Sequence, residues 1–261
     1  MKIHNLIILF VLLFYKGQSQ ITTFEKTYSD AYVDMGADFQ QTSDGGYIIV
    51  ANTDEWNNCT NSSFIVEPFF DIYLIKTDSQ GDTLWTKIIA DSSQGTGSMD
   101  IASAVLEIEN QSGYVMVGST GRFPQDTSYD IYFVMTDNIG NIITTQRYGT
   151  TLDNEMGYDI QQTTDKGFII VGVRGDCLYS TGDIYIVKID STGNLIWDKT
   201  IDETHCDLAY SVQQTVDGGY MIAGTSVASS SGYDVYLLKV DSQGNKQWSK
   251  NIVGSNHDQA N

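Results

Sequence analysis

The chain repeats one phrase four times, and this repetition restricts the possible fold more than any other feature. The phrase reads "QTSDGGYIIVANT" in its first copy, and the four copies are centred on Tyr47, Tyr114, Phe168 and Tyr220. A second phrase follows each copy, such as "DIYLIKTDSQGDTLW" in the first repeat; it begins at Asp71, Asp130, Asp183 and Asp234. A period of about fifty residues without helical spacing of apolar residues indicates a radial or stacked array of β-units.

Each repeat predicts four short strands. A turn of the Asp-Gly-Gly kind follows the first strand, because tight hairpins need glycine in a left-handed backbone conformation. A second turn, as at Asp78–Asp82, leads into the fourth strand, which carries Trp85, Trp197 or Trp248. The second repeat diverges most and has Thr144 at the tryptophan position. Repeated units of four antiparallel strands are typical of the blades of a β-propeller.

The predicted fold class is therefore all-β, a β-propeller of four-stranded antiparallel blades. We expect the repeats at about 36–94, 100–154, 157–207 and 209–261. The segment Thr22–Tyr28 matches the fourth strands, and the final "HDQAN" resembles the start of a first strand near His205. We therefore expect an incomplete ring that is truncated at the C-terminus, with an elongated stack of sheets as the alternative. The recurring Trp and Tyr are expected to fill the space between blades, since buried aromatic side chains dominate such cores.

The first twenty residues have the features of a secretory signal peptide. Lys2 precedes the apolar run Leu6–Tyr15, and small and polar residues follow it. The repeat domain then spans 21–261. The formal net charge of −19 repels DNA, RNA and acidic lipids, so no nucleic-acid partner is expected. No later segment is long and apolar enough for a transmembrane helix, so we expect a secreted or cell-surface protein.

The phrase Asp-x-x-Gly-x-x-x-Trp, as in Asp78–Trp85, resembles the tryptophan-docking repeat of quinoprotein-type (PQQ-like) propellers. The whole unit, with its "QQTxDGGY", is similar to the propeller repeats of exported bacterial surface proteins, many of which end in a sorting domain. This resemblance covers essentially everything after the signal peptide and implies a propeller. No cofactor-binding motif accompanies it, so no quinone or other cofactor is expected. The Asp-box of sialidases has a shorter spacing, and sialidase activity is not inferred.

The aspartates of the turns do not predict a metal site. Their spacing lacks the alternating oxygen ligands and the distal Glu of an EF-hand loop. An Asp at the head of a tight turn is explained by its hydrogen bonds to nearby backbone N–H groups.

The two ends of the predicted blades differ in their loops. The turns after the first and third strands are short and uniform, whereas the connections at the other end vary in length and content. Variable loops on a rigid scaffold are where binding usually occurs. Their aromatic and arginine residues suit carbohydrate stacking or a protein contact, and their carboxylates suit a cation or basic ligand, although such charges are more often simply solvated. The candidate ligand-binding residues are Trp56, Arg122, Phe123, Arg174, Tyr179, Asp54, Glu55, Asp153, Glu155, Asp202 and Glu203.

All three cysteines fall at this variable end. Cys177 and Cys206 flank one blade, so a Cys177–Cys206 disulfide is the preferred pairing in an exported protein, with Cys59 free or paired elsewhere. Three unlinked thiols fit the same spacing equally well.

These features predict an exported, non-catalytic propeller that serves as a binding, adhesion or scaffold module for a glycan or protein ligand. The alternative is an extracellular polysaccharide hydrolase or lyase with paired rim carboxylates as acid and base. No catalytic residue is assigned, because no nucleophile–His–Asp set is evident. Two rim carboxyl groups about 5–10 Å apart in a concave, partly buried pocket would favour the enzyme, and a flat rim with scattered charges would favour the binder.

Overall fold

The computed structural model describes residues 24–29, 33–54, 70–90, 98–122, 128–175, 182–203, 206–227 and 233–252. Sixteen strands form four antiparallel sheets of four strands each, and the strands within each sheet follow chain order. A single 3-10 turn, η3 (Glu109–Gln111), accompanies them in this part of the chain. The all-β prediction is confirmed.

Each sheet is one blade. Blade 1 contains β1 (Val33–Gln41), β2 (Tyr47–Asp54), β3 (Asp71–Thr77) and β4 (Thr83–Ile89). Blade 2 contains β5 (Ser98–Glu107), β6 (Tyr114–Arg122), β7 (Asp130–Thr136) and β8 (Ile142–Tyr148). Blade 3 contains β9 (Glu155–Gln162), β10 (Phe168–Arg174), β11 (Asp183–Ile189) and β12 (Leu195–Ile201). Blade 4 contains β13 (Asp207–Gln214), β14 (Tyr220–Ser226), β15 (Asp234–Val240) and β16 (Lys246–Ile252).

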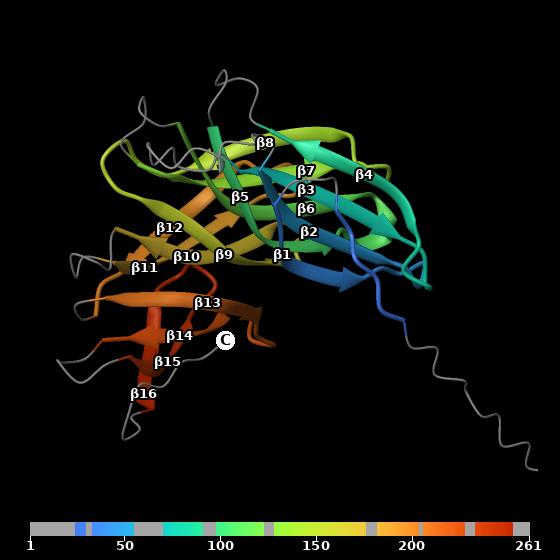
Figure 1. Ribbon diagram of the computed structural model, residues 1–261. Helices are drawn as coiled ribbons and strands as arrows, with labels where there is room; N and C mark the ends of the chain where they lie inside the picture. The colour runs from blue at the N-terminus through green and yellow to red at the C-terminus, as the bar shows by residue number, and fades with distance from the viewer. Residues whose placement is uncertain are drawn as a thin grey trace, which may run out of the picture.

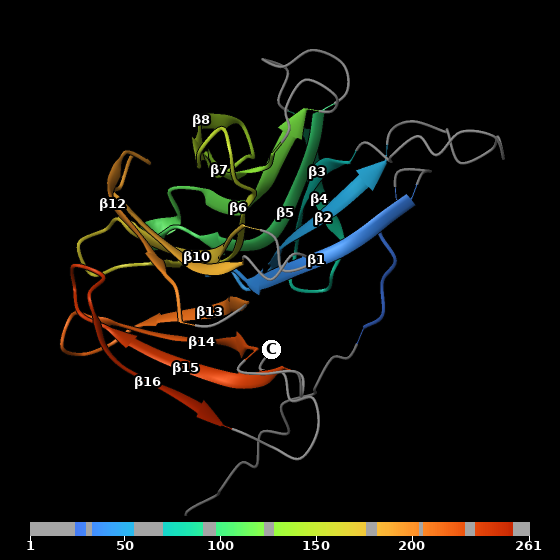
Figure 2. The ribbon, with the colours of Figure 1, turned by 90° about the vertical axis from the view of Figure 1, so that its left-hand side faces the viewer.

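The blades are arranged radially, with their first strands inside. Strand β5 packs against β1 and β2, β9 against β5 and β6, and β13 against β9 and β10. Strands β8, β12 and β16 lie at the outside of the arrangement (Figures 1 and 2). This is the geometry of a β-propeller, as predicted.

The apolar core lies between blades. One cluster joins blades 1 and 2, a second joins blades 2 and 3, and a third joins blades 3 and 4. Among the described residues, no such cluster joins blade 4 to blade 1, so these four blades form an open arc. We call each packed surface between successive blades a junction.

The aromatic residues of the repeat fill the junctions, as predicted. The ring of Trp85 lies 5.9 Å from that of Tyr114, and the ring of Trp197 lies 6.2 Å from that of Tyr220. In both pairs, the tryptophan of one blade packs on the tyrosine of the next. The glycine of the next blade's second turn lies against the tryptophan: a Cβ on Gly140 would come within 2.7 Å of Trp85.

The repeated Gln-Gln phrase joins neighbouring blades through hydrogen bonds. The backbone N–H of Glu107 donates to the side-chain oxygen of Gln40 at 2.6 Å, and that of Gln214 donates to Gln161 at 2.5 Å. In the opposite direction, the N–H of Thr164 donates to the side chain of Gln214 at 2.9 Å. These bonds explain why the phrase recurs, since each satisfies a backbone N–H of the adjacent blade.

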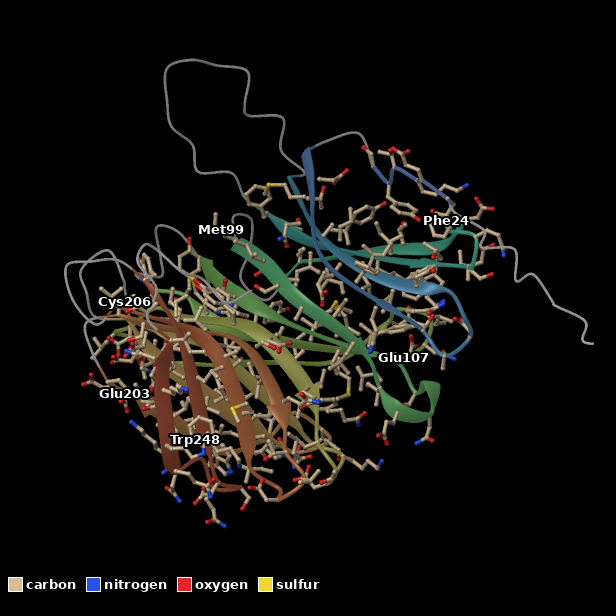
Figure 3. All side chains as sticks on the ribbon, turned by 90° about the horizontal axis from the view of Figure 1, so that it is seen from below. Phe24, Met99, Glu107, Glu203, Cys206 and Trp248 are labelled. Carbon is tan, nitrogen blue, oxygen red and sulfur yellow. The ribbon has the colours of Figure 1, made fainter. Side chains whose placement is uncertain are left out.

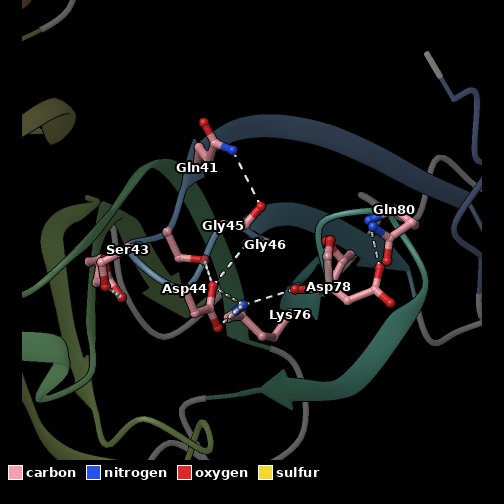
Figure 4. A network of polar contacts seen from close by, with 11 residues as sticks. Gln41, Ser43, Asp44, Gly45, Gly46, Lys76, Asp78 and Gln80 are labelled. Atoms are coloured by element: carbon pink, nitrogen blue, oxygen red, sulfur yellow. Dashed lines mark hydrogen bonds and ion pairs between the residues drawn. The ribbon is translucent and has the colours of Figure 1, made fainter. Parts of the chain in front are cut away.

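A buried lysine ties the first turn to the third strand in three blades. In blade 1, the Lys76 ammonium donates to Asp44 at 3.1 Å and to the carbonyl of Thr77 at 2.8 Å (Figure 4). The Thr42 hydroxyl and the Lys76 ammonium lower the pKa of Asp44 to about 2. Lys188 with Asp165 and Lys239 with Asp217 repeat the arrangement.

Replacing Lys188 by Met should lower the free energy of unfolding by about 1–2 kcal/mol, because the carbonyl of Ile189 and the carboxylate of Asp165 lose a buried cationic donor. The pKa of Asp165 is lowered in the fold, so this contribution is present at neutral pH and is lost as the carboxyl is protonated in acid. Urea unfolding at pH 7 and pH 3 measures both effects. Lys250→Met, at an exposed position, is the matched control and should stay within about 0.5 kcal/mol; equal values for the two variants would refute the role of Lys188.

The segment before blade 1 takes the position of a preceding fourth strand. The Phe24 ring lies 5.8 Å from Tyr47, a contact of the same kind as the tryptophan–tyrosine pairs. The Tyr28 hydroxyl donates to the carbonyl of Gly81 at 2.9 Å. These contacts agree with the match between this segment and the fourth strands, although residues 24–29 belong to no strand of the described sheets.

Candidate functional site

The two ends of the blades form two rims. The hairpin rim carries the short turns after the first and third strands, and the variable rim carries the remaining connections. Cys206 and Glu203 lie together on one side of the molecule in Figure 3, well away from Glu107 at the hairpin rim. The candidate site lies at the variable rim of blade 3, where β9, β10, β11 and β12 meet the loops from neighbouring blades.

One row of residues crosses every blade at the variable rim. It consists of an acidic residue on the first strand, a hydroxyl on the second and an aspartate that begins the third. Blade 3 departs from this pattern, because an arginine replaces the hydroxyl. The rows are Asp34–Thr53–Asp71, Asp100–Thr120–Asp130, Glu155–Arg174–Asp183 and Asp207–Ser226–Asp234.

A backbone hydrogen bond brings two rows together at each junction. The N–H of the first-strand acid donates to the carbonyl just before the third-strand aspartate of the preceding blade. The bond lengths are 2.7 Å from Asp100 to Phe70, 2.7 Å from Glu155 to Tyr129 and 2.8 Å from Asp207 to Gly182. Carboxylates from two blades therefore converge at each junction.

The first-strand acids are buried and hold the rim loops in place. Glu155 and Asp207 are 0% exposed, so they cannot touch a ligand directly. Glu155 accepts hydrogen bonds from the N–H and hydroxyl of Thr150 at 3.1 and 3.2 Å, and the Thr150 hydroxyl accepts the N–H of Asp153 at 3.3 Å. Asp207 accepts the N–H of Glu203 at 3.3 Å. The buried acids thus position the loops that carry the exposed Asp153, Asp202 and Glu203.

Asp183 lies between these two loops. The pKa of the Asp183 carboxyl is raised to about 6. Burial is the largest cause, and the nearby carboxylates of Asp202, Asp207 and Asp153 contribute the rest. The residue is nevertheless partly exposed at the rim. A carboxyl group that titrates near neutral pH and can reach solvent suits general acid catalysis.

Arg174, which pairs with Asp183 in the strand register, lines a pocket that faces blade 2. Its Nε donates to Glu155 Oε1 at 2.9 Å, and its guanidinium lies 3.9 Å above the ring of Tyr185. Its Nη2 lies 3.5 Å from Asp198 Oδ2, which also accepts the Tyr185 hydroxyl at 2.8 Å. The corresponding residues in other blades are Thr86, Thr145 and Ser249, so Asp198 is specific to blade 3.

The pocket has a volume of about 290 Å³ and lies between β8 and blade 3. Charged and aromatic side chains line it together, including Arg147, Tyr148, Arg174, Tyr185 and Asp198. A single guanidinium links Glu155 with Asp198, through contacts of 2.9 and 3.5 Å. Concave pockets of this size, with a few converging polar groups, are typical ligand sites.

Glu155 has a second, unbonded oxygen within this cluster. Its Oε2 is buried and has no hydrogen-bond partner among the described residues. Oε2 and Asp130 Oδ1 both point at Gly149, where an added Cβ would lie 2.7 and 2.3 Å from them, so the two oxygens are at most about 5 Å apart. Burial raises the pKa of Glu155, against the opposing effect of its bonds to Thr150 and Arg174.

Of the predicted ligand-binding residues, Glu155 and Arg174 contact each other, and Asp153 and Asp202 lie near Asp183. Glu203 forms an ion pair with Lys246. Asp54 and Arg122 end strands β2 and β6 in other blades. Trp56, Glu55, Phe123 and Tyr179 lie outside the described residues, as do Cys59 and Cys177. Cys206 is disulfide-bonded, and its pairing with Cys177 stays a prediction.

Asp183, Asp198 and Tyr185 were not predicted as site residues, because all three read as ordinary strand positions. A signal for Asp198 was available: it replaces Thr or Ser of the other repeats. Within the described ranges, no group of three or more His, Cys, Asp or Glu side chains is arranged to hold a metal ion. The same ranges contain no helix with the length and hydrophobicity to cross a bilayer.

Comparisons with known proteins bear on the fold. No protein-family model and no curated protein matches the chain. Among solved structures, it is similar to an endo-arabinase from Bacteroides thetaiotaomicron, with 11% identity, a TM-score of 0.49 and coverage of 86% of this chain and 82% of that one. A thermostable family-43 glycoside hydrolase has 12% identity, a TM-score of 0.49 and coverage of 84% and 75%. A puromycin hydrolase has 9% identity, a TM-score of 0.52 and coverage of 84% and 32%. At these identities the likeness concerns the fold alone.

The prediction of a non-catalytic binding, adhesion or scaffold module was wrong. Similar structures are named as hydrolytic enzymes, among them an endo-arabinase and a glycoside hydrolase. The rim carboxylates of blade 3 are gathered and not scattered. Those of Asp153 and Asp202 lie close enough to the partly buried Asp183 to raise its pKa.

Proposed function

We propose that this protein is an extracellular propeller enzyme that hydrolyses glycosidic bonds of a polysaccharide at the variable rim of blade 3. The observation that carries the proposal is the placement of Asp183, a partly exposed carboxyl with a pKa of about 6, between loops that carry two further exposed carboxylates. The export signal expected from the sequence supports a site of action outside the cell. The quinoprotein-type repeat resemblance concerns the scaffold only and adds no cofactor.

Asp183 acts as the proton donor. In its protonated form it gives its proton to the glycosidic oxygen as the bond to the anomeric carbon breaks. The second carboxylate is Asp153 or Asp202, the exposed acids on either side. It either removes a proton from the attacking water or attacks the anomeric carbon itself, and the separation of the two carboxyls decides between inversion and retention.

The surrounding residues position this pair and the sugar. Glu155 holds the Asp153 loop through Thr150, and Asp207 holds the neighbouring loop through Glu203. The pocket with Arg174, Tyr185 and Asp198 offers donors and acceptors for the hydroxyls of a sugar unit of the same chain. Because Arg174 is neutralised by Glu155 and Asp198, the pocket suits a neutral sugar better than an acidic one.

The rate of cleavage should depend on pH as a bell with its alkaline limb near pH 6. The pKa of Asp183 is raised, so the protonated donor is present below about pH 6 and is lost above it. The second carboxylate must be ionised to act as base or nucleophile, so the rate should fall again in acid. A profile of kcat/KM from pH 3.5 to 8.5 measures both limbs, and a rate that keeps rising above pH 7 would exclude Asp183 as the donor.

A panel of neutral and acidic polysaccharides, assayed for new reducing ends, tests the proposed function directly. We expect cleavage of at least one neutral polysaccharide by the wild-type protein and none by Asp183→Asn or by Asp153→Asn/Asp202→Asn. Lys246→Gln, which removes the ion pair to Glu203, is the surface control and should retain activity. The proposal fails if no glycan is cleaved, or if the Asp183 variant cleaves as fast as the wild type.

A further inference from the structure

The junction between blades 2 and 3 lacks the tryptophan that fills the other two. Trp85 packs on Tyr114 and Trp197 packs on Tyr220, but the equivalent position in blade 2 is Thr144. The loss is not isolated: the partner in blade 3 is Phe168 and carries no hydroxyl. This junction therefore lacks the tryptophan ring on one side and the tyrosine hydroxyl on the other.

The lysine of the repeat is missing at the same place. Met135 pairs with Thr144 in the strand register, where Lys76 pairs with Trp85 and Lys188 with Trp197. The turn that supplies the lysine's aspartate in other blades reads Glu-Asn-Gln-Ser here and contains no Asp. The polar part of the repeat has thus been replaced by an apolar one.

Phe133 fills only part of the space that the tryptophan would occupy. Leucine occupies the equivalent position in blades 1 and 4. The Phe133 ring lies 5.8 Å from that of Phe168. A Cβ on Gly193 would lie 3.0 Å from the Phe133 ring, just as one on Gly140 would lie 2.7 Å from Trp85. The inner half of the junction is therefore packed, and the outer half is not.

A cavity of about 310 Å³ remains in the outer half and opens at the hairpin rim. Its apolar walls come from Ile108, Met135, Ile143 and Phe168. Lys166 and Glu109 lie at its mouth and form an exposed ion pair with each other. The site is on the rim opposite to the carboxylates of blade 3, so it is separate from the proposed active site.

We propose that this cavity binds a small molecule with a planar aromatic ring of the size of indole. The same strands and turns enclose an indole side chain at the junctions on either side, so the surrounding backbone already accommodates that shape. An enclosed apolar cavity of about 150 Å³ is enough to bind benzene; this site is larger and open, with apolar walls and polar side chains around them. Met135 replaces the lysine of the other blades, and the charges of Lys166 and Glu109 neutralise each other in their ion pair. The site therefore favours a neutral ring.

Titration of the full-length protein with 5-fluoroindole, followed by fluorine NMR, tests the proposal. We expect saturable binding with one site per chain. Ser191→Phe places a ring on an exposed turn residue at the cavity wall and should weaken binding at least tenfold without changing the core. Asn138→Phe is the matched control, since it occupies the same turn position at the junction filled by Trp85, and should change the affinity less than twofold.

A second variant restores the pattern of blade 1. Phe133→Leu/Thr144→Trp should fill the cavity, abolish 5-fluoroindole binding and raise the melting temperature. If this variant does not fold, the comparison of Ser191→Phe with Asn138→Phe still decides. Absence of saturable binding to the wild type, or equal affinity in the two phenylalanine variants, would overturn the proposal.

Discussion

Replacing Asp183 by Asn should lower the rate of polysaccharide cleavage by about 100- to 10,000-fold, the range that a positioned general acid contributes. The amide cannot give up a proton to the leaving oxygen, yet it has nearly the same size and can occupy the same place at the start of β11. KM should change little, because sugar binding rests on the neighbouring pocket. Initial rates with the cleaved polysaccharide, at the pH optimum, measure the effect.

The same substitution should stabilise the fold at neutral pH. The pKa of Asp183 is higher in the folded chain than in the unfolded one, so its ionisation above about pH 6 disfavours the folded state. The asparagine variant should therefore gain about 1 kcal/mol at pH 7.5 after allowing for solvent screening, and the gain should vanish below pH 4. A variant that loses activity and stability together would instead point to a structural role.

Replacing Phe133 by Ala should lower the free energy of unfolding by about 3–5 kcal/mol, the usual result for truncating a buried phenylalanine. The side chain is 0% exposed and packs within the cluster that joins blades 2 and 3, with ring contacts to Phe168 and Tyr148. Because each blade buries its faces only against its neighbours, a weakened junction affects both blades. Urea unfolding followed by circular dichroism measures the change.

Two control variants show whether the loss of stability comes from the buried packing of Phe133 or from removing any phenylalanine. Phe39→Ala removes a phenylalanine that is 66% exposed and should change the stability by less than about 1 kcal/mol. Phe133→Leu restores the residue of blades 1 and 4 and should cost less than about 1.5 kcal/mol. Comparable losses from Phe39→Ala and Phe133→Ala would contradict a core that lies between the blades.

The fold was predictable because the same physical requirement recurs in every repeat. A glycine turn and an alternating strand return about every fifty residues, with a tryptophan in three of the four repeats, and only stacked blades bury the apolar faces of such strands. The Gln-Gln phrase marked the end of a strand in the sequence, but its bonds to the next blade could not be foreseen. They depend on the stagger between neighbouring inner strands, which no local pattern encodes.

The candidate site was only partly predictable. Asp153, Asp202 and Arg174 stood out as charged residues in variable connections, whereas Asp183 recurs in every repeat and read as a strand residue. Its raised pKa arises from carboxylates that two other connections bring beside it, a proximity that exists only in three dimensions. Asp198 differs from its counterparts in the other blades, and comparison between repeats would have found it.

The proposed activity depends on a rim carboxylic acid that keeps its proton close to neutral pH. The most direct measurement is the titration of the Asp183 carboxyl carbon by NMR, assigned by its absence from the Asp183→Asn spectrum. We expect a pKa of about 6 that falls when Asp153 and Asp202 are both replaced by Asn. A pKa near that of an ordinary aspartate, about 4, would contradict the proposed proton donor and with it the proposed activity.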